Sequence, residues 1–243
     1  MPTFQRAGAN IYFEEYGSGY PLLLFAPGGM RSSIEFWHKS PFDPTAEFAN
    51  EFRVIAMDQR NAGKSRAPIS ASDGWDTYTA DHIALLDHLG FKSCHIMGGC
   101  IGGSYDLGLI KAAPDRVTAA VLQQPIGLSP HNRELFLQMF DGWAKALKKE
   151  RPEIDETAFQ PFRERMYGKT DFVFNVTRDF VRTVKTPLLI LRGNDEYHPA
   201  ETSEEIAQLA PNAEIIKEWK TPEVVGKTVE RVREFLRSHR PSK

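Results

Sequence analysis

Residues 95–104 read HIMGGCIGGS, and this short stretch decides the fold. An apolar strand pattern runs into Cys100, with glycines two positions before it and two and three positions after it, and a helical pattern follows at once. This is the layout of a nucleophile elbow, G-x-Nu-x-G, at a tight turn from strand to helix. Such a turn strains the backbone of the nucleophile and admits only small residues two positions either side. The sequence therefore predicts that the Cys100 sulfur stands above the strand ends, at the N-terminus of a helix.

Strand and helix patterns alternate on both sides of this elbow. An alternating hairpin is expected in residues 3–16. Buried strands are then predicted at residues 22–26, 52–57, 93–97, 117–123, 187–191 and 213–217. Amphipathic or helix-starting patterns predict helices at residues 75–89, 101–113, 200–209 and 223–238. This alternation indicates an α/β fold with a mostly parallel central sheet and helices on both faces.

One segment interrupts the alternation. Residues 124–185 contain irregular, mostly helical patterns rich in aromatic and charged residues. We therefore expect a core domain made of residues 1–123 and 186–243, and a helical lid, residues 124–185, inserted after the sixth strand.

Composition narrows the class of protein. The chain has 243 residues, 41% hydrophobic and 26% charged, which is typical of a globular protein with a sizeable core. A net charge of −2 gives no basic field for nucleic acid, and no apolar run is long enough to predict a membrane span. Only two cysteines are present, so we expect no disulfide framework and a reducing, cytoplasmic location. Nothing in the sequence excludes a homo-oligomer.

Three further stretches, together with the elbow, resemble the α/β-hydrolase fold family over nearly the whole chain. Residues 58–65, DQRNAGKS, are similar to the D-x-R-G-x-G-x-S loop of that family, with Asn61 in place of a usual glycine. Residues 77–90 resemble the helix before the nucleophile strand, and residues 193–199, GNDEYHP, resemble the acid-bearing loop. The resemblance implies an α/β-hydrolase fold, a small-molecule substrate with an apolar portion, and no cofactor or metal.

The resemblance also suggests roles for individual residues. The usual nucleophile is serine, and some relatives use cysteine, so Cys100 is the expected nucleophile. Backbone N–H groups of Ile101 and of Gly29 or Met30 would form the oxyanion hole, since these donors are main-chain groups. Asp195 keeps the family's spacing from aspartate to proline and is the expected acid. Glu196 is the alternative acid if the loop is counted from its first glycine.

The general base is the main departure from the family pattern. The family's histidine follows the last strand, but here residues 218–222 read EWKTP and contain no histidine. His198, three residues after Asp195, is the preferred substitute among the histidines, although its position at a helix start before Pro199 favours a purely structural role. Lys220 is a weaker alternative, because a lysine must be strongly desolvated to be neutral at pH 7.

The sequence thus predicts a cofactor-independent hydrolase that acts on a small ester, thioester or lactone through Cys100, with an atypical or incomplete triad. A thiol needs less help from a base than a hydroxyl does, so loss of the usual histidine is compatible with catalysis. The alternative is a catalytically impaired protein that binds or senses a small molecule on the same scaffold. Lyase or isomerase chemistry is a third option that no residue pattern favours.

Overall fold

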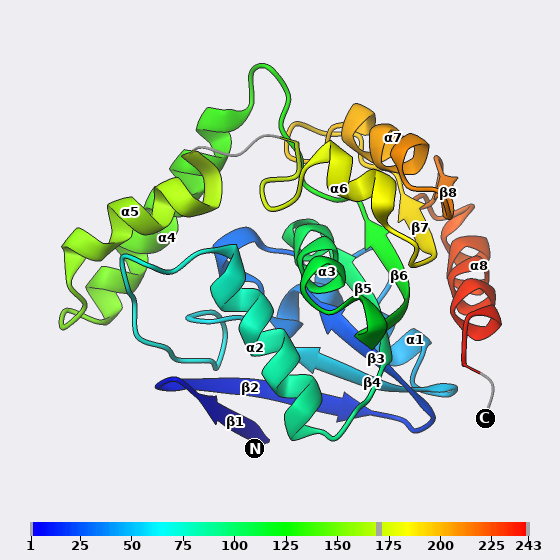
Figure 1. Cartoon of the computed structure of the whole chain (residues 1–243), viewed down its shortest axis with the longest axis horizontal. Helices are drawn as coiled ribbons and strands as arrows, with labels where there is room; N and C mark the ends of the chain where they lie inside the picture. Colours follow the sequence, from blue (N-terminus) through cyan, green and yellow to red (C-terminus); the bar gives the residue numbers. More distant parts are fainter. Residues whose placement is uncertain (1, 169–171, 242–243) are drawn as a thin grey trace.

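Eight β-strands form one sheet within residues 2–168 and 172–241, the part of the chain that the computed structural model describes (Figure 1). Their order across the sheet is β1-β2-β4-β3-β5-β6-β7-β8. The strands are β1 Thr3–Arg6, β2 Ala9–Tyr16, β3 Tyr20–Phe25, β4 Phe52–Met57, β5 Cys94–Gly99, β6 Val117–Gln123, β7 Leu188–Leu191 and β8 Ala213–Ile216.

The strand directions divide the sheet into a hairpin edge and a parallel body. β2 pairs antiparallel with both β1 and β4, whereas every neighbouring pair from β4 to β8 is parallel. Parallel strands need crossover connections, which place helices over the faces of the sheet. All parallel strands therefore end at the same edge, where β5 delivers Cys100.

Two hydrophobic clusters cover the two faces of the sheet. On β3, Leu23 and Phe25 belong to the cluster under α2 (Trp75–His88) and α3 (Ile101–Ala112). The alternate residues Leu22 and Leu24 belong to the cluster under α8 (Val225–Ser238). Because successive side chains of a strand point to opposite faces, a continuous apolar run such as β3 is stable only when helices cover both faces.

The connection between β6 and β7 is helical, and we call it the α4–α6 segment (residues 124–187). It contains α4 Arg133–Glu150, η4 Glu156–Ala158, α5 Phe159–Arg163, the π-helical turn η5 Glu164–Gly168 and α6 Arg178–Thr183. α4 and α5 pack side by side, and α6 lies beside α7 (Ala200–Leu209) (Figure 1). The buried face of α4 carries Phe136, Phe140 and Trp143, which join the same hydrophobic cluster as α2 and α3.

Most predicted elements agree with the structure within two residues. β4, β6 and α7 have the predicted bounds, and α2, α3 and α8 differ by one or two residues at an end. The connection between β3 and β4 differs more. The sequence predicts no helix there, whereas the structure has η1 Gly29–Arg31, η2 Ile34–Lys39 and α1 Pro44–Glu47. A further short 3-10 helix, η3 Pro114–Arg116, precedes β6. Among the described helices, none combines the length and apolar character needed to span a bilayer.

Candidate active site

Cys100 lies at the turn between β5 and α3 with a strained backbone. Its φ is 58° and its ψ is −116°, in a region that non-glycine residues rarely adopt. The turn requires glycine at the flanking positions because other chain segments lie so close. A Cβ atom on Gly98 would lie 2.2 Å from the backbone of Gly102, and one on Gly102 would lie 2.2 Å from the carbonyl oxygen of Phe25.

Hydrogen bonds to neighbouring segments hold this strained residue in place. The N–H of Cys100 donates to the carbonyl of Gln123 at 2.9 Å. Its carbonyl accepts from the N–H groups of Gly103 at 3.1 Å and Ile126 at 3.2 Å. The ends of β5, β6 and α3 therefore fix the position of the half-buried thiol.

His198 and Asp195 form a close pair in the loop between β7 and α7. Nδ1 of His198 lies 2.7 Å from Oδ1 and 2.9 Å from Oδ2 of Asp195. The loop is closed by two reciprocal backbone hydrogen bonds between these residues, at 3.1 and 3.3 Å. The Asp195 side chain is 46% exposed whereas that of His198 is 11% exposed, so the imidazole points inward and its carboxylate partner lies at the surface.

Asp195 fixes the orientation of the imidazole. The hydrogen bond from His198 and its positive charge hold the pKa of Asp195 below its ordinary value, so the carboxylate is ionised. An ionised carboxylate at Nδ1 leaves Nε2 as the ring atom available for chemistry. Nε2 is buried and makes no well-formed hydrogen bond within the described residues.

Cys100 and His198 are coupled electrostatically. Burial alone would raise the pKa of the Cys100 thiol, but the positive charge of His198 holds the pKa below its ordinary value. Burial likewise opposes protonation of His198, yet the Cys100 charge and the contact with Asp195 raise its pKa to about 9. The direction of both shifts favours a thiolate beside an imidazolium near neutral pH.

Backbone N–H groups complete the surroundings of the sulfur. The backbone N–H groups of Gly28 and Ile101 both contribute to lowering the pKa of Cys100. Gly28 has a φ of 116°, which lets its N–H approach the elbow. Gly29 and Met30 begin η1 directly after it, and the Met30 sulfur accepts a hydrogen bond from Tyr167 at 3.7 Å.

Gly28 is the site residue that sequence reasoning missed. The oxyanion prediction named Ile101 with Gly29 or Met30, although the Pro-Gly-Gly turn at residues 27–29 offers either glycine. Which of the two glycines turns its N–H toward the sulfur depends on backbone dihedrals that the sequence does not specify. The signal that could have found Gly28 is its place as the first glycine after the strand.

The loop after β8, where relatives carry histidine, is filled by other residues. Trp219 is buried and its indole N–H donates to the carbonyl of Arg192 at 2.8 Å. The Lys220 ammonium donates to the side chain of Gln124 at 3.1 Å. Lys220 is therefore occupied by a hydrogen bond to the residue after β6, and the structure gives it no contact with Cys100. The alternative acid, Glu196, is exposed one residue beyond Asp195.

The remaining histidines have partners or positions away from the thiol. His82 is buried against Gln59 and its pKa is lowered to about 3 by burial. His95 is also buried, on β5, and its pKa is lowered to about 3 for the same leading reason. His38 pairs with Asp43 at 2.6 Å on the surface, and His131 is exposed. His198 is thus the histidine that the structure brings to Cys100.

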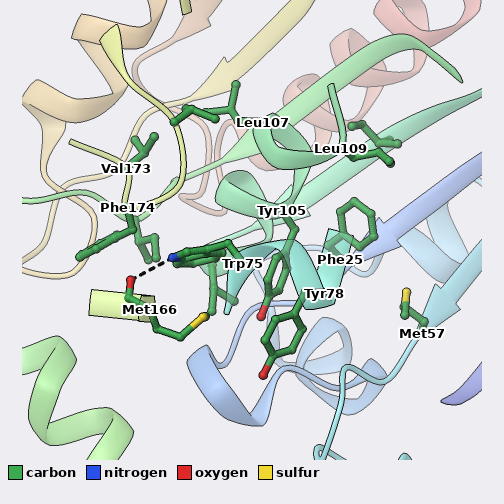
Figure 2. Close-up of a cluster of buried hydrophobic side chains, with 14 of the residues drawn as sticks. Phe25, Met57, Trp75, Tyr78, Tyr105, Leu107, Leu109, Met166, Val173 and Phe174 are labelled. Carbon is green, nitrogen blue, oxygen red and sulfur yellow. Dashed lines mark hydrogen bonds between the residues drawn. The ribbon is translucent and has the colours of Figure 1, made fainter. Parts of the chain in front are cut away.

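Aromatic side chains from α2, α3 and the α4–α6 segment form one layer next to the site (Figure 2). Trp75 donates a hydrogen bond from its indole to the carbonyl of Met166 at 2.9 Å, which ties α2 to η5. Phe174 packs on Phe136 at 4.6 Å and on Tyr167 at 5.1 Å between ring centroids. Within the described residues, no group of three histidine, cysteine or acidic side chains is arranged to hold a metal ion.

Comparisons with known proteins agree with this architecture. RutD of Azorhizobium caulinodans, which its name proposes to be a carbamate hydrolase, is 30% identical over 147 residues, 60% of this chain and 46% of that protein. The chain thus matches about half the length of that relative. A 2-hydroxymuconate semialdehyde hydrolase from Pseudomonas putida is 27% identical, covering 86% of this chain and 82% of the relative.

The same fold is present in solved structures. The enol-lactonase from Burkholderia xenovorans LB400 superimposes with a TM-score of 0.73 and 18% identity, covering 97% of this chain and all of that chain (100%). The family model for the alpha/beta hydrolase fold matches residues 21–184, from β3 through the α4–α6 segment. The fold expected from the sequence is therefore confirmed, and the chain belongs to the α/β-hydrolase fold family.

Proposed function

We propose that this protein is a cofactor-independent hydrolase that attacks a small ester, thioester or lactone with Cys100. The observation that carries the proposal is the arrangement of Cys100, His198 and Asp195, with two backbone N–H groups directed at the sulfur. His198 is the base and Asp195 orients it. The base comes from the acid loop itself, three residues after Asp195, rather than from the loop after β8.

Acylation uses the charge-separated pair. The Cys100 thiolate attacks the substrate carbonyl carbon, and the carbonyl oxygen becomes negative in the tetrahedral intermediate. The N–H of Ile101, together with an N–H from residues 28–30, stabilises that oxygen. The imidazolium of His198 then transfers its proton from Nε2 to the leaving group, the C–O or C–S bond breaks, and a thioester on Cys100 remains.

Deacylation requires a neutral base, and acylation itself supplies one. The Cys100 charge is the leading cause that raises the pKa of His198 against burial. Once the sulfur is acylated that charge is gone, and His198 has already given up its proton. Neutral Nε2 can then take a proton from water as the water attacks the thioester carbon. The C–S bond breaks and the thiolate leaves while the proton stays on His198, so the starting pair of thiolate and imidazolium is restored.

The α4–α6 segment is proposed to act as a lid over the thiol. Its buried aromatic residues lie in the same cluster as α2 and α3, and α3 begins directly after Cys100. An apolar enclosure of this kind binds the hydrocarbon part of a small substrate and keeps bulk water from the thioester. A reducing compartment such as the cytoplasm suits an enzyme with a free nucleophilic thiol, and both cysteines are free.

One observation favours the alternative of a binding protein without turnover. Asp195 is half-exposed, and Nε2 of His198 makes no well-formed hydrogen bond with the described residues. If the imidazole moves away from the thiol in solution, the pocket is kept but deacylation is lost. The first experiment must therefore separate formation of the acyl-enzyme from its decay.

That experiment is intact-mass analysis after exposure to an activated short-chain ester across pH 5 to 9. We expect one acyl adduct on the wild type, formed below the ordinary thiol pKa of about 8.5 and decaying with time. Cys100→Ala should form none, whereas Cys94→Ala should react like the wild type. Cys94 is the matched control because burial raises the pKa of its thiol to about 12.

Each outcome has a definite meaning. If the acyl adduct forms but does not decay, the protein has a reactive thiol without turnover, which supports the alternative of a binding protein. Equal ester consumption by wild type and Cys100→Ala would refute Cys100 as the nucleophile.

A further inference from the structure

Three buried tyrosine side chains from three different elements belong to the hydrophobic cluster against which Cys100 packs. Tyr78 lies on α2, Tyr105 on α3 and Tyr167 on the π-helical turn η5, and all three are at most 2% exposed. The rings of Tyr78 and Tyr105 stack with their centroids 5.2 Å apart. Figure 2 shows these two side chains next to each other, with their hydroxyl groups pointing to the same side.

The hydroxyl groups of these tyrosines lack good acceptors. The Tyr105 hydroxyl is buried without a hydrogen-bond partner, and the Tyr167 hydroxyl donates only to the Met30 sulfur at 3.7 Å. Sulfur of a thioether is a weak acceptor. Within the described residues, no hydrogen bond involves the Tyr78 hydroxyl either. A buried donor without an acceptor costs roughly 1–3 kcal/mol, so a site that keeps such donors is prepared for a ligand that supplies the acceptor.

Two of these hydroxyl groups, those of Tyr105 and Tyr167, lie within the electrostatic reach of Cys100. Burial raises the pKa of Tyr105 and of Tyr167 well above the ordinary value, and the Cys100 charge raises both further. Trp75 links the two tyrosines, since its ring packs 5.6 Å from Tyr105 and 6.0 Å from Tyr167. Cys100 packs against the same hydrophobic cluster that holds both tyrosines, so the two donors are part of the layer beside the nucleophile.

We propose that Tyr105 and Tyr167, with Tyr78 stacked on Tyr105, form a substrate subsite that donates hydrogen bonds to an uncharged carbonyl oxygen, separate from the carbonyl that Cys100 attacks. This inference rests on the proposed function, because it assigns the substrate of that site. The acceptor is uncharged because a carboxylate there would be repelled by the neighbouring thiolate. The substrate class is thus an oxo-substituted acyl ester, thioester or lactone.

The test compares four thioesters of equal chain length: hexanoyl and its 3-oxo, 4-oxo and 5-oxo derivatives. Each kcat/KM is divided by the rate of uncatalysed hydrolysis, which removes differences in intrinsic reactivity. We expect the wild type to prefer at least one oxo substrate by about tenfold or more over hexanoyl. Tyr105→Phe should reduce that preference to near one, which a general loss of folding or thiol reactivity would not do.

Tyr20→Phe is the matched control, because the Tyr20 hydroxyl bonds Ser93 and Thr118 rather than the pocket tyrosines. It should keep the oxo preference of the wild type. Absence of any oxo preference in the wild type, or an unchanged preference in Tyr105→Phe, overturns the proposal.

A binding measurement separates this proposal from the proposed catalysis. Cys100→Ala is titrated with 2,5-hexanedione and with 2-hexanone by isothermal titration calorimetry. Tighter binding of the dione, lost in Cys100→Ala/Tyr105→Phe, supports the subsite even if Cys100 is not the nucleophile. Equal binding of the two ketones contradicts the subsite even if Cys100-dependent hydrolysis is observed.

Discussion

At the scale of single residues, the chemistry depends on the position of one imidazole. His198→Gln removes the positive charge that offsets the burial of the Cys100 thiol, so the thiol pKa is expected to rise. The thiolate is the nucleophile, and each unit of increase removes about 90% of it at a pH below the pKa. Alkylation of Cys100 by iodoacetamide at pH 7 should therefore slow by about tenfold or more.

The rate of Cys100 alkylation should depend on pH in a defined direction. In the wild type the thiolate is present above the lowered pKa of Cys100, so alkylation slows only as the pH falls through that value. In His198→Gln the same decline should occur at higher pH. His131→Gln, a change at an exposed histidine, is the control and should follow the wild type. Identical profiles for wild type and His198→Gln would show that the imidazole does not act on the sulfur.

The effect of the Cys100 charge on the pKa of His198 can also be measured. Burial lowers the pKa of His198, and the Cys100 charge with Asp195 raises it to about 9. Cys100→Ala removes the leading cause that raises this pKa, so the pKa of His198 should fall well below about 9. An NMR titration of the imidazole Cε1 proton in both proteins measures this. A pKa that stays near 9 in Cys100→Ala would assign the shift to Asp195 and would leave deacylation without a neutral base.

At the scale of elements, the elbow is held by close backbone contact between β5 and α3. Gly98→Ala would place a Cβ 2.2 Å from the Gly102 backbone, where no side chain can move aside. We expect a loss of about 3 kcal/mol in the free energy of unfolding. Urea denaturation measures it, and a loss below about 1 kcal/mol would mean that the elbow is not close-packed.

Gly142→Ala is the matched control within another helix. Gly142 lies inside α4, and a Cβ there meets nothing within 4 Å. Alanine is favoured over glycine in a helix interior by up to about 1 kcal/mol, so this variant should be slightly more stable than the wild type. If Gly98→Ala lowers the free energy of unfolding and Gly142→Ala raises it, the loss at Gly98 is due to steric exclusion at the elbow. A general preference for glycine would give the same sign at both positions.

At the scale of the whole molecule, the sequence was sufficient for the fold but not for the full site. Strands such as β4 and β6 follow from continuous apolar runs, because burial on both faces leaves a strong pattern. The elbow was predictable because its tight turn leaves no room for side chains at the flanking positions, and glycines at those positions are visible in the sequence. The inward direction of His198 depends on how the loop between β7 and α7 closes, and the pattern of residues does not encode that closure. The choice of Gly28 as an N–H donor depends likewise on dihedrals.

A second question at the scale of the whole molecule is whether the α4–α6 segment unfolds separately from the sheet. Phe136 and Trp143 of α4 lie in one hydrophobic cluster with Ile96 of β5 and Leu122 of β6. A lid that shares its core with the sheet should unfold together with it. Hydrogen exchange under increasing denaturant should therefore give the same opening free energy for the buried amides of α4 and for those of β5. If α4 exchanges at much lower denaturant, the α4–α6 segment opens as an independent unit. Access to Cys100 would then be set by that local opening rather than by rotation of single side chains.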